Sequence, residues 1–354
     1  MTAPVNVQVI AGPGLNSGAH LRALDGWRGL SILLVLAAHL LPLSPKAWQV
    51  NVSVGILGMV LFFILSGFLI TSFLLKDKNI INFLIRRFFR VVPLAWLYLA
   101  IALTVSGATI YAWIAHYLFY ANLPPVALVA LTDHIWSLCA EVQFYVGIAM
   151  LVALFGVRSL VILPILALLF TAFRIWHGIT VSSITYYRID EILAGCTLAL
   201  VYHGRFGYFF RDQIKKIPQL PIFLLLAVSC MPQGQWLNYF RPYLAAILIG
   251  LTLLDPDSSL VNRLNSRFLI YVAGISYSLY VIHPLLAGSW LGSGDIYEKY
   301  AKRPLLFLVL FVLAYLSTNY YENWFIAYGR KLVQRVSSYR VKLALSPLKP
   351  ADEN

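Results

Sequence analysis

An arginine and a histidine lie within one apolar stretch near the start of the chain, LDGWRGLSILLVLAAHLLP, residues 24–42. Arg28 and His39 are eleven residues apart. At about 100° per residue, this spacing exceeds three full helical turns by only about 20°, so both side chains lie on one face of a helix. They are roughly 16 Å apart along its axis. Ionisable groups inside a membrane helix are costly, so this pair is the first candidate site.

A carboxylate occupies another apolar stretch, HIWSLCAEVQFY, residues 134–145. His134, Ser137 and Glu141 fall at i, i+3 and i+7, on one helical face. We expect Glu141 to reach the depth of His39, where a carboxylate would fix the imidazole tautomer and stabilise its protonated form. The alternative is that Glu141 bonds to the backbone or to Tyr145 and only holds helices together, since a buried carboxylate needs some partner.

Three arginines lie in a basic segment, FLIRRFFRVVP, residues 83–93. Arg86 and Arg90 share a helical face, and Arg87 flanks it. Guanidinium groups bind phosphate in bidentate fashion, so the cluster suits a pyrophosphate or a nucleotide phosphate. The alternative, which spacing alone favours, is a cytoplasmic anchor that contacts lipid headgroups.

Charged residues also begin the stretch YRIDEILAGC, residues 187–196. Arg188, Asp190 and Glu191 could hold one another as ion pairs, or they could line an entrance for a polar substrate. The ion-pair interpretation is favoured, because charged pairs at the ends of membrane helices are common.

A histidine followed by a proline lies in GISYSLYVIHPLL, residues 274–286. Pro284 loosens the helical hydrogen bonds that precede it, beside His283. Tyr277 adds a hydroxyl on a nearby turn. Helix packing explains such a hydroxyl at least as well as catalysis does.

These residues must be positioned by membrane helices. The chain has 354 residues, of which 60% are hydrophobic and 12% charged, which indicates a polytopic integral membrane protein. Apolar runs predict an all-α fold of about ten transmembrane helices. In the second run, Gly58, Ser66 and Gly67 are small residues that permit close helix approach. The predicted spans are residues 24–43, 52–75, 91–110, 138–156, 159–175, 189–202, 217–232, 240–254, 269–290 and 304–326.

The net charge of +13 follows the predicted topology. A cytoplasmic N-terminus places twenty of the 27 Lys and Arg residues inside, so both termini are predicted to be cytoplasmic. We expect a mobile N-terminal tail over residues 1–21, a transmembrane domain over 22–328 and a basic tail over 329–354 along the anionic inner leaflet. No nucleic-acid partner is needed to explain the charge. The three cysteines show no metal-ligand spacing, so no metal site is predicted.

The ordered set of motifs resembles the acyltransferase 3 family of membrane O-acyltransferases. The matching pieces are Arg28 with His39, LFFILSGFLIT, the arginine segment, HIWSLCAEVQFY, YRIDEILAG and ISYSLYVIHP, over roughly residues 22–326. The resemblance implies transfer of an acyl group, usually acetyl from acetyl-CoA, to a hydroxyl of a sugar or related acceptor. It implies a catalytic role for His39, with Arg28 as its motif partner, and donor binding by Arg86 and Arg90.

The chain departs from the family pattern at one position. Two glutamates commonly precede Gln-Phe-Tyr in the family, whereas here Glu141 is followed by Val142. The chain therefore lacks the second carboxylate that a two-carboxylate mechanism would need at this position. Some relatives carry a fused extracytoplasmic esterase-like domain. We expect this chain to be the form without it, which releases its product directly or passes it to a separate extracytoplasmic protein. The family also implies a bacterial inner membrane.

The resulting hypothesis is an O-acetyltransferase that holds the phosphates of cytoplasmic acyl-CoA on Arg86, Arg87 and Arg90. No tightly bound cofactor is expected, since acyl-CoA is a co-substrate. His39 acts either as a general base or through a transient acyl-histidine. The candidates for binding the carbohydrate acceptor are His134, Ser137, Arg188, Asp190, Tyr277 and His283. The alternative function is a proton-coupled transporter that uses the same His, Arg and Glu residues, although no paired repeat halves are visible.

Overall fold

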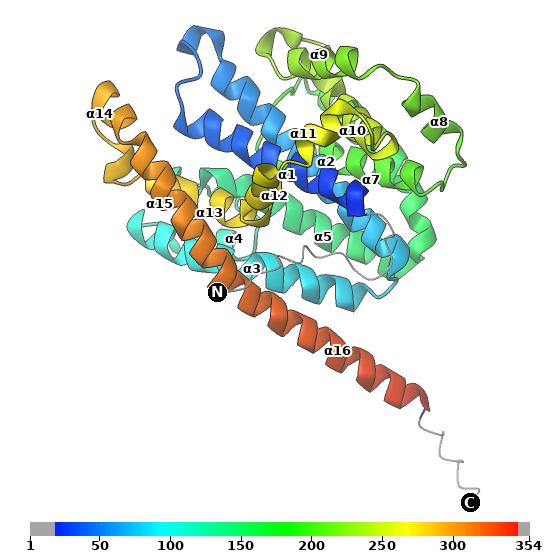
Figure 1. Cartoon of the computed structure of the whole chain (residues 1–354). Coiled ribbons are helices and arrows are strands. Elements are labelled where there is room, and N and C mark those ends of the chain that lie inside the picture. Colours follow the sequence, from blue (N-terminus) through cyan, green and yellow to red (C-terminus); the bar gives the residue numbers. More distant parts are fainter. Residues whose placement is uncertain (1–17, 346–354) are drawn as a thin grey trace, which may run out of the picture.

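The chain folds into helices joined by loops and short helical turns. Figure 1 shows the computed structural model, which describes residues 18–345. No strand forms among these residues, so the all-α prediction is confirmed for them. The α-helices are α1 (Gly18–Leu40), α2 (Val50–Lys76), α3 (Ile80–Val105), α4 (Ile110–Tyr117), α5 (Trp136–Phe155), α6 (Leu163–Trp176), α7 (Ile189–Tyr202), α8 (Phe209–Lys215), α9 (Gln219–Ser229), α10 (Leu237–Leu254), α11 (Ser259–Leu264), α12 (Arg267–Gly274), α13 (Ser276–Ala287), α14 (Ile296–Ala301), α15 (Arg303–Leu316) and α16 (Asn323–Leu345).

Seven helices in the described part are long and apolar enough to cross a membrane, or eight if α12 and α13 form one span. The predicted count of about ten is not confirmed, because it included two short helices. α7 has 14 residues and α9 has 11, so they are roughly 21 and 16 Å long against a hydrocarbon core of ~30 Å. A helix buried among other helices is apolar all round, as a lipid-facing one can be. In α7, eleven of the 14 residues are buried.

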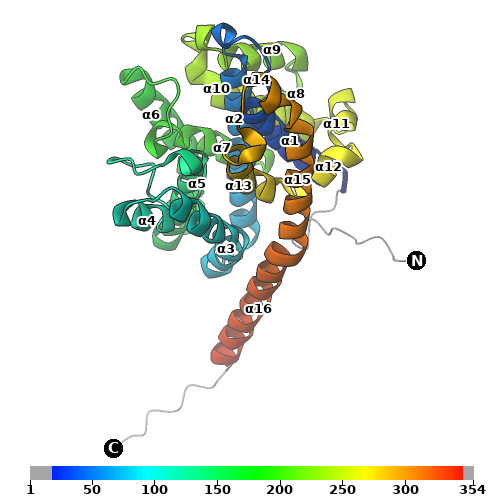
Figure 2. The same ribbon diagram turned by 90° about the vertical axis from the view of Figure 1, so that its left-hand side faces the viewer.

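Helix α2 packs between α1 and α7 at the centre of the bundle (Figure 2). Small residues allow this close approach, as the sequence predicts. A Cβ atom on Gly67 would lie 1.9 Å from the carbonyl oxygen of Ile192 in α7. A Cβ atom on Gly58 would lie 2.8 Å from the carbonyl oxygen of Ser31 in α1. Larger side chains at these positions would push apart the helices that position the site.

The predicted span over residues 269–290 is broken. Helices α12 and α13 meet at a bend of 70°, with Ile275 between them. α12 packs along α1, whereas α13 turns toward α15, α1 and α3. The bend therefore places the His-Pro segment of α13 among helices that come from the first part of the chain.

Helices α15 and α16 form one long helix through a π-helical turn at Ser317–Glu322. The helical stretch Arg303–Ser338 has 36 residues, and its most apolar part is long enough to cross a membrane. Figures 1 and 2 show α16 projecting from the bundle. The predicted start of a basic tail at residue 329 falls inside α16, where the backbone has no break. Most of the predicted tail over residues 1–21 and the end of the C-terminal one lie outside the described residues. The side of the membrane on which the termini lie stays a prediction.

Candidate functional site

A cavity opens between α1, α2, α3, α5 and α13. It contains about 790 Å³ of space that no protein atom fills, part of it open to solvent. Each of the five helices contributes a polar side chain to the lining: Arg28, Ser66, Arg90, Glu141 and Tyr277, in the order of the helices.

Helix α1 presents one face to the cavity. Arg28, Ile32 and Val35 line it, at helical spacings that place them on the same side. His39 follows one turn after Val35, but its exposed side chain is not part of the lining. The Arg28 guanidinium faces the cavity and lies 3.6 Å from the carboxylate of Asp25. Arg28 is therefore at the cavity, and His39 lies beyond its end.

Two of the three predicted phosphate-binding arginines face the cavity. Arg87 and Arg90 line it, whereas Arg86 does not. The Arg87 guanidinium carbon lies 5.6 Å from the ring centroid of Tyr145. The Arg86 guanidinium carbon lies 5.6 Å from the ring centroid of Phe73 instead. The sequence spacing predicted that Arg86 and Arg90 share a face, whereas in the structure Arg87 and Arg90 line the cavity together. Both pairs are compatible with a helix, because positions three apart also share a face.

Glu141 forms hydrogen bonds within the cavity wall. Its Oε1 accepts from Ser66 Oγ at 2.7 Å and from the Tyr145 hydroxyl at 2.5 Å. Among the described residues, neither His39 nitrogen bonds to Glu141, so the expected support of His39 by this carboxylate is absent. Glu141 lines the cavity and His39 does not, while Tyr145 lies one turn further along the same face of α5 and reaches the carboxylate. Glu141 thus has the alternative partner that the sequence left open.

Three histidines from separate helical segments meet beyond the cavity. His39 Nδ1 lies 2.9 Å from His283 Nε2, and His283 Nδ1 lies 2.7 Å from the carbonyl oxygen of Tyr280. The ring centroid of His134 lies 5.4 Å from that of His283. His134 is buried, and neither of its ring nitrogens has a hydrogen-bond partner among the described residues. The sequence named all three histidines as site residues but gave no reason to expect them to meet.

Tyr280 lies between the cavity and the histidines. Its side chain lines the cavity, and its hydroxyl lies 2.6 Å from Ser137 Oγ. Its ring centroid lies 5.9 Å from that of His283. Tyr277 also lines the cavity and donates to the carbonyl oxygen of Val91 at 2.5 Å. Ser137 and Tyr277 are therefore at the cavity, and each is held by a hydrogen bond to another helix.

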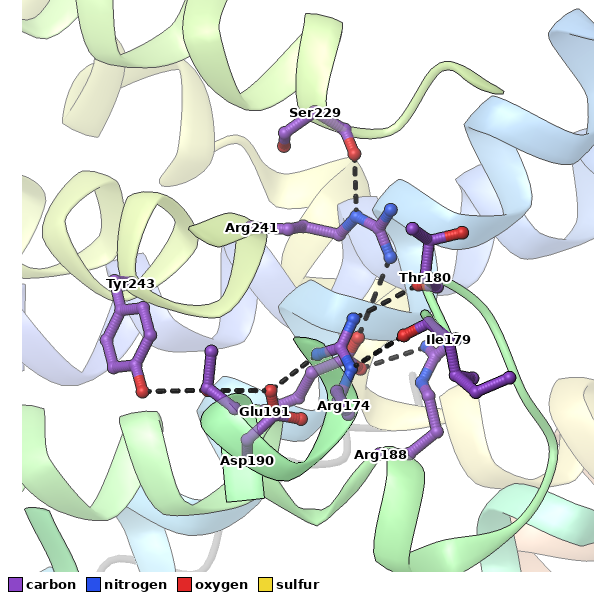
Figure 3. A network of polar contacts seen from close by, with 10 residues as sticks. Arg174, Ile179, Thr180, Arg188, Asp190, Glu191, Ser229, Arg241 and Tyr243 are labelled. Carbon is purple, nitrogen blue, oxygen red and sulfur yellow. Dashed lines mark hydrogen bonds and ion pairs between the residues drawn. The ribbon is translucent and has the colours of Figure 1, made fainter. Parts of the chain in front are cut away.

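Arg188 and Asp190 belong to a separate group of charged residues, called here the sealed cluster (Figure 3). Arg174 Nη1 lies 2.5 Å from Asp190 Oδ2, and Arg188 Nη2 lies 2.9 Å from Glu191 Oε2. Arg241 Nη1 lies 4.0 Å from Glu191 Oε1. Each of these five side chains is at most 2% exposed. The ion-pair interpretation holds, with Arg174 as the partner of Asp190, and neither Arg188 nor Asp190 lines the cavity.

The cavity has a surplus of positive charge. Its lining includes the guanidinium groups of Arg28, Arg87 and Arg90 but the single carboxylate of Glu141, and in the described part of the chain only Arg28 among the three has an ion-pair partner, Asp25. No guanidinium in the described part of the chain lies within ion-pair distance of Glu141. Clefts of one sign with low-dielectric walls concentrate ions of the other sign, and guanidinium groups match phosphate in geometry. The arrangement can therefore bind an anion, while the exposed His39 can exchange a proton or act as a nucleophile.

Sequence reasoning missed one member of the site. Ser66 was assigned to helix packing alone, whereas its hydroxyl donates to Glu141. The available signal was that a hydroxyl inside an apolar helix must find a polar partner. No group of three His, Cys, Asp or Glu side chains between residues 18 and 345 is arranged to hold a metal ion.

Curated relatives share one described activity. The O-acetyltransferase OatA of Staphylococcus aureus is 26% identical over 317 aligned residues, which cover 75% of this chain and 50% of the relative. The peptidoglycan O-acetyltransferase OatA of Listeria monocytogenes is 25% identical over 313 residues, with 75% and 49% covered. The chain spans about half the length of these relatives. No solved structure matches it significantly.

A family model described as an acyltransferase domain matches residues 21–320. This range contains all the residues that line the cavity, the three histidines and the sealed cluster. It also contains every motif on which the resemblance was based, in the same order. The chain belongs to the acyltransferase 3 family.

Proposed function

We propose that the chain is a membrane O-acyltransferase that moves an acyl group, acetyl in the first instance, from cytoplasmic acyl-CoA to a hydroxyl of a sugar-containing acceptor. The family and the relatives named as O-acetyltransferases support the class of reaction. The observation that carries the donor assignment is the cavity with three guanidinium groups and one carboxylate. Coenzyme A has several phosphates, so it complements this charge.

The donor would lie along the cavity face of α1. Its phosphates contact Arg87 and Arg90, with Arg28 further along the wall. Arg28 and His39 are roughly 16 Å apart along the helix axis. A pantetheine arm can cross about half of a ~30 Å hydrocarbon core, so the thioester can approach His39. Tyr280 lies between the cavity and the histidines, so the thioester passes its side chain.

His39 provides the proton transfer in this proposal. The acceptor oxygen bonds to the thioester carbonyl carbon, and the carbon–sulfur bond breaks. His39 takes the hydroxyl proton and returns it to the departing thiolate, which leaves an ester and the free thiol of coenzyme A. In the alternative route, His39 itself attacks the thioester and the carbon–sulfur bond breaks, which expels the coenzyme A thiolate. The acceptor hydroxyl then takes the acyl group from His39, and its proton goes to the thiolate. Both routes require His39 in its neutral form.

Peptidoglycan sugar is the first acceptor to test, because the Listeria relative is named as a peptidoglycan O-acetyltransferase. Other envelope glycans are the next class. A bacterial inner membrane would give the chain access to acyl-CoA on one side and to glycan on the other. The basic residues Arg330, Lys331 and Arg335 on α16 suit contact with anionic lipid headgroups.

The test uses the purified full chain in lipid nanodiscs with radiolabelled acetyl-CoA and soluble peptidoglycan fragments. We expect label on the glycan, and a loss of about 10²–10⁴-fold in kcat for His39→Ala. His177→Ala is the matched control, because His177 is an exposed histidine directly after α6 and outside the cavity. A His39→Ala variant with an unchanged rate would contradict both chemical routes.

The same preparation distinguishes the transporter alternative. In sealed proteoliposomes, a transporter would move glycan fragments or protons without acetyl-CoA. An acyltransferase would modify the glycan only when acetyl-CoA is present. Flux that needs no acetyl-CoA, together with no labelled product, would replace the proposed function by the alternative one.

A further inference from the structure

Pro284 changes the hydrogen bonding of α13 beside His283. In a regular helix the N–H of residue 284 would bond to the carbonyl oxygen of Tyr280, four residues earlier. Proline has no N–H, so this oxygen is left for another donor. His283 Nδ1 lies 2.7 Å from it. Because a carbonyl oxygen can only accept, Nδ1 of His283 carries a proton.

The position of the proton on the His283 ring determines which nitrogen of His39 is protonated. His283 is 1% exposed and contacts no carboxylate among the described residues, so its neutral form is favoured. A neutral imidazole protonated at Nδ1 can only accept at Nε2. His39 Nδ1 lies 2.9 Å from this Nε2 and therefore donates to it. The lone pair of His39 is then on its own Nε2.

The two rings have the geometry of an in-plane hydrogen bond. Their planes differ by 14°, and their centroids are 5.1 Å apart. This separation is close to the nitrogen–nitrogen distance of 2.9 Å plus one ring radius on each side. The rings thus approach edge to edge rather than face to face. Imidazole N–H bonds and lone pairs lie in the ring plane, so the hydrogen bond is well directed.

We propose that His283 is the positioning residue for His39, an inference that rests on the proposed function in which His39 is the base. The Tyr280 carbonyl fixes the tautomer of His283, and His283 Nε2 holds His39 with Nδ1 protonated. His39 Nε2 is the nitrogen left to the substrate, because Nδ1 is engaged and the side chain is exposed. His283 is thus assigned to orientation and not to the acceptor binding that the sequence suggested.

This arrangement differs from the carboxylate-oriented histidine of serine hydrolases. A neutral orienting imidazole fixes the ring and its tautomer but does not neutralise the imidazolium that forms on His39. The ring of His134, centred 5.4 Å from that of His283, does not compete, since both nitrogens of His283 are engaged. The hydrogen-bond relay, from the Tyr280 carbonyl oxygen through His283 to His39, therefore needs only the two rings and one backbone oxygen.

Two substitutions at one position test the relay kinetically. His283→Leu removes both hydrogen bonds, whereas His283→Gln offers an amide oxygen to His39 and an amide N–H to the Tyr280 carbonyl. We expect His283→Leu to lower kcat at least about 10-fold with the acetyl-CoA KM within about twofold. His283→Gln should recover most of that loss. An equal loss in the two variants, or a loss confined to KM, would overturn the proposal.

A spectroscopic test does not depend on activity. Nitrogen-15 NMR of histidine-labelled full chain in nanodiscs separates protonated from unprotonated ring nitrogens, with His39→Ala and His283→Gln used for assignment. We expect protonated Nδ1 and unprotonated Nε2 on both His39 and His283. A proton on His39 Nε2 in the wild-type chain would overturn the relay. If the wild type transfers no acetyl group but shows the expected tautomers, the proposed function fails while the relay stands.

Discussion

The chain places arginines inside its helical bundle in two regions, and the two differ in what surrounds the charge. In the sealed cluster, Arg174 and Arg188 each have a carboxylate within 2.9 Å, and the side chains are at most 2% exposed. At the cavity, Arg87 and Arg90 line open space, and Glu141 accepts from two hydroxyls instead. Charges that are paired and closed off hold helices together, whereas charges that face a cavity remain available to a ligand.

The largest difference in stability between the two regions is expected for a substitution at Asp190. We expect Asp190→Ala to leave the Arg174 guanidinium buried without its carboxylate, which costs about 3–5 kcal/mol of unfolding free energy. Glu141→Ala should cost less, since it removes hydrogen bonds to Ser66 and Tyr145 only. Thermal unfolding of both variants in nanodiscs measures the difference. Equal destabilisation would mean that the two regions share one structural role.

Substitution of the cavity arginines is expected to change substrate binding and to leave stability nearly unchanged. Arg87→Gln with Arg90→Gln should raise the acetyl-CoA KM by roughly 10–100-fold, since a hydrogen bond to a charged group contributes about 1.5–3 kcal/mol. Thermal stability should change little, because neither arginine has a carboxylate partner within 4 Å in the described part. Arg86→Gln is the control, as Arg86 does not line the cavity. A KM increase in Arg86→Gln of the same size would favour the lipid-anchor interpretation.

The smallest difference between the two regions is expected in their response to ionic strength. Between about 0.05 and 0.5 M salt, screening of the open cavity should raise the acetyl-CoA KM a few-fold. The sealed cluster is at most 2% exposed, so the unfolding temperature should hardly respond. Initial rates and thermal unfolding over one salt series test both points. A salt-independent KM would argue against phosphate recognition by the arginines.

Helical periodicity predicted the parts of the site that depend on one helix. The spacing of Arg28 and His39 along α1 is local, and the cavity lining by Arg28, Ile32 and Val35 follows that face. The all-α class and the close approach at Gly67 likewise follow from composition and residue size.

Contacts between segments were not predictable in the same way. Nothing in the sequence chooses Arg174 over Arg188 as the partner of Asp190, since the choice depends on how α6 packs on α7. The same holds for His39 and His283, which are 244 residues apart in sequence. The count of about ten spans is not confirmed for a related reason: burial among helices and burial in lipid select the same apolar residues.

The projecting helix α16 has a mechanical consequence for the cavity. The charge pattern of the sequence predicts a tail from residue 329. In the structure, however, Gly329 packs closely against α3, since a Cβ atom on Gly329 would lie 2.8 Å from Phe89 Cβ. The ring centroids of Phe89 and Tyr328 are 5.3 Å apart. Phe89 directly precedes Arg90, so the contact of α16 with Phe89 supports the turn of α3 that carries the arginines. A substitution that displaces α16 from Phe89 would therefore also displace the backbone that holds Arg90.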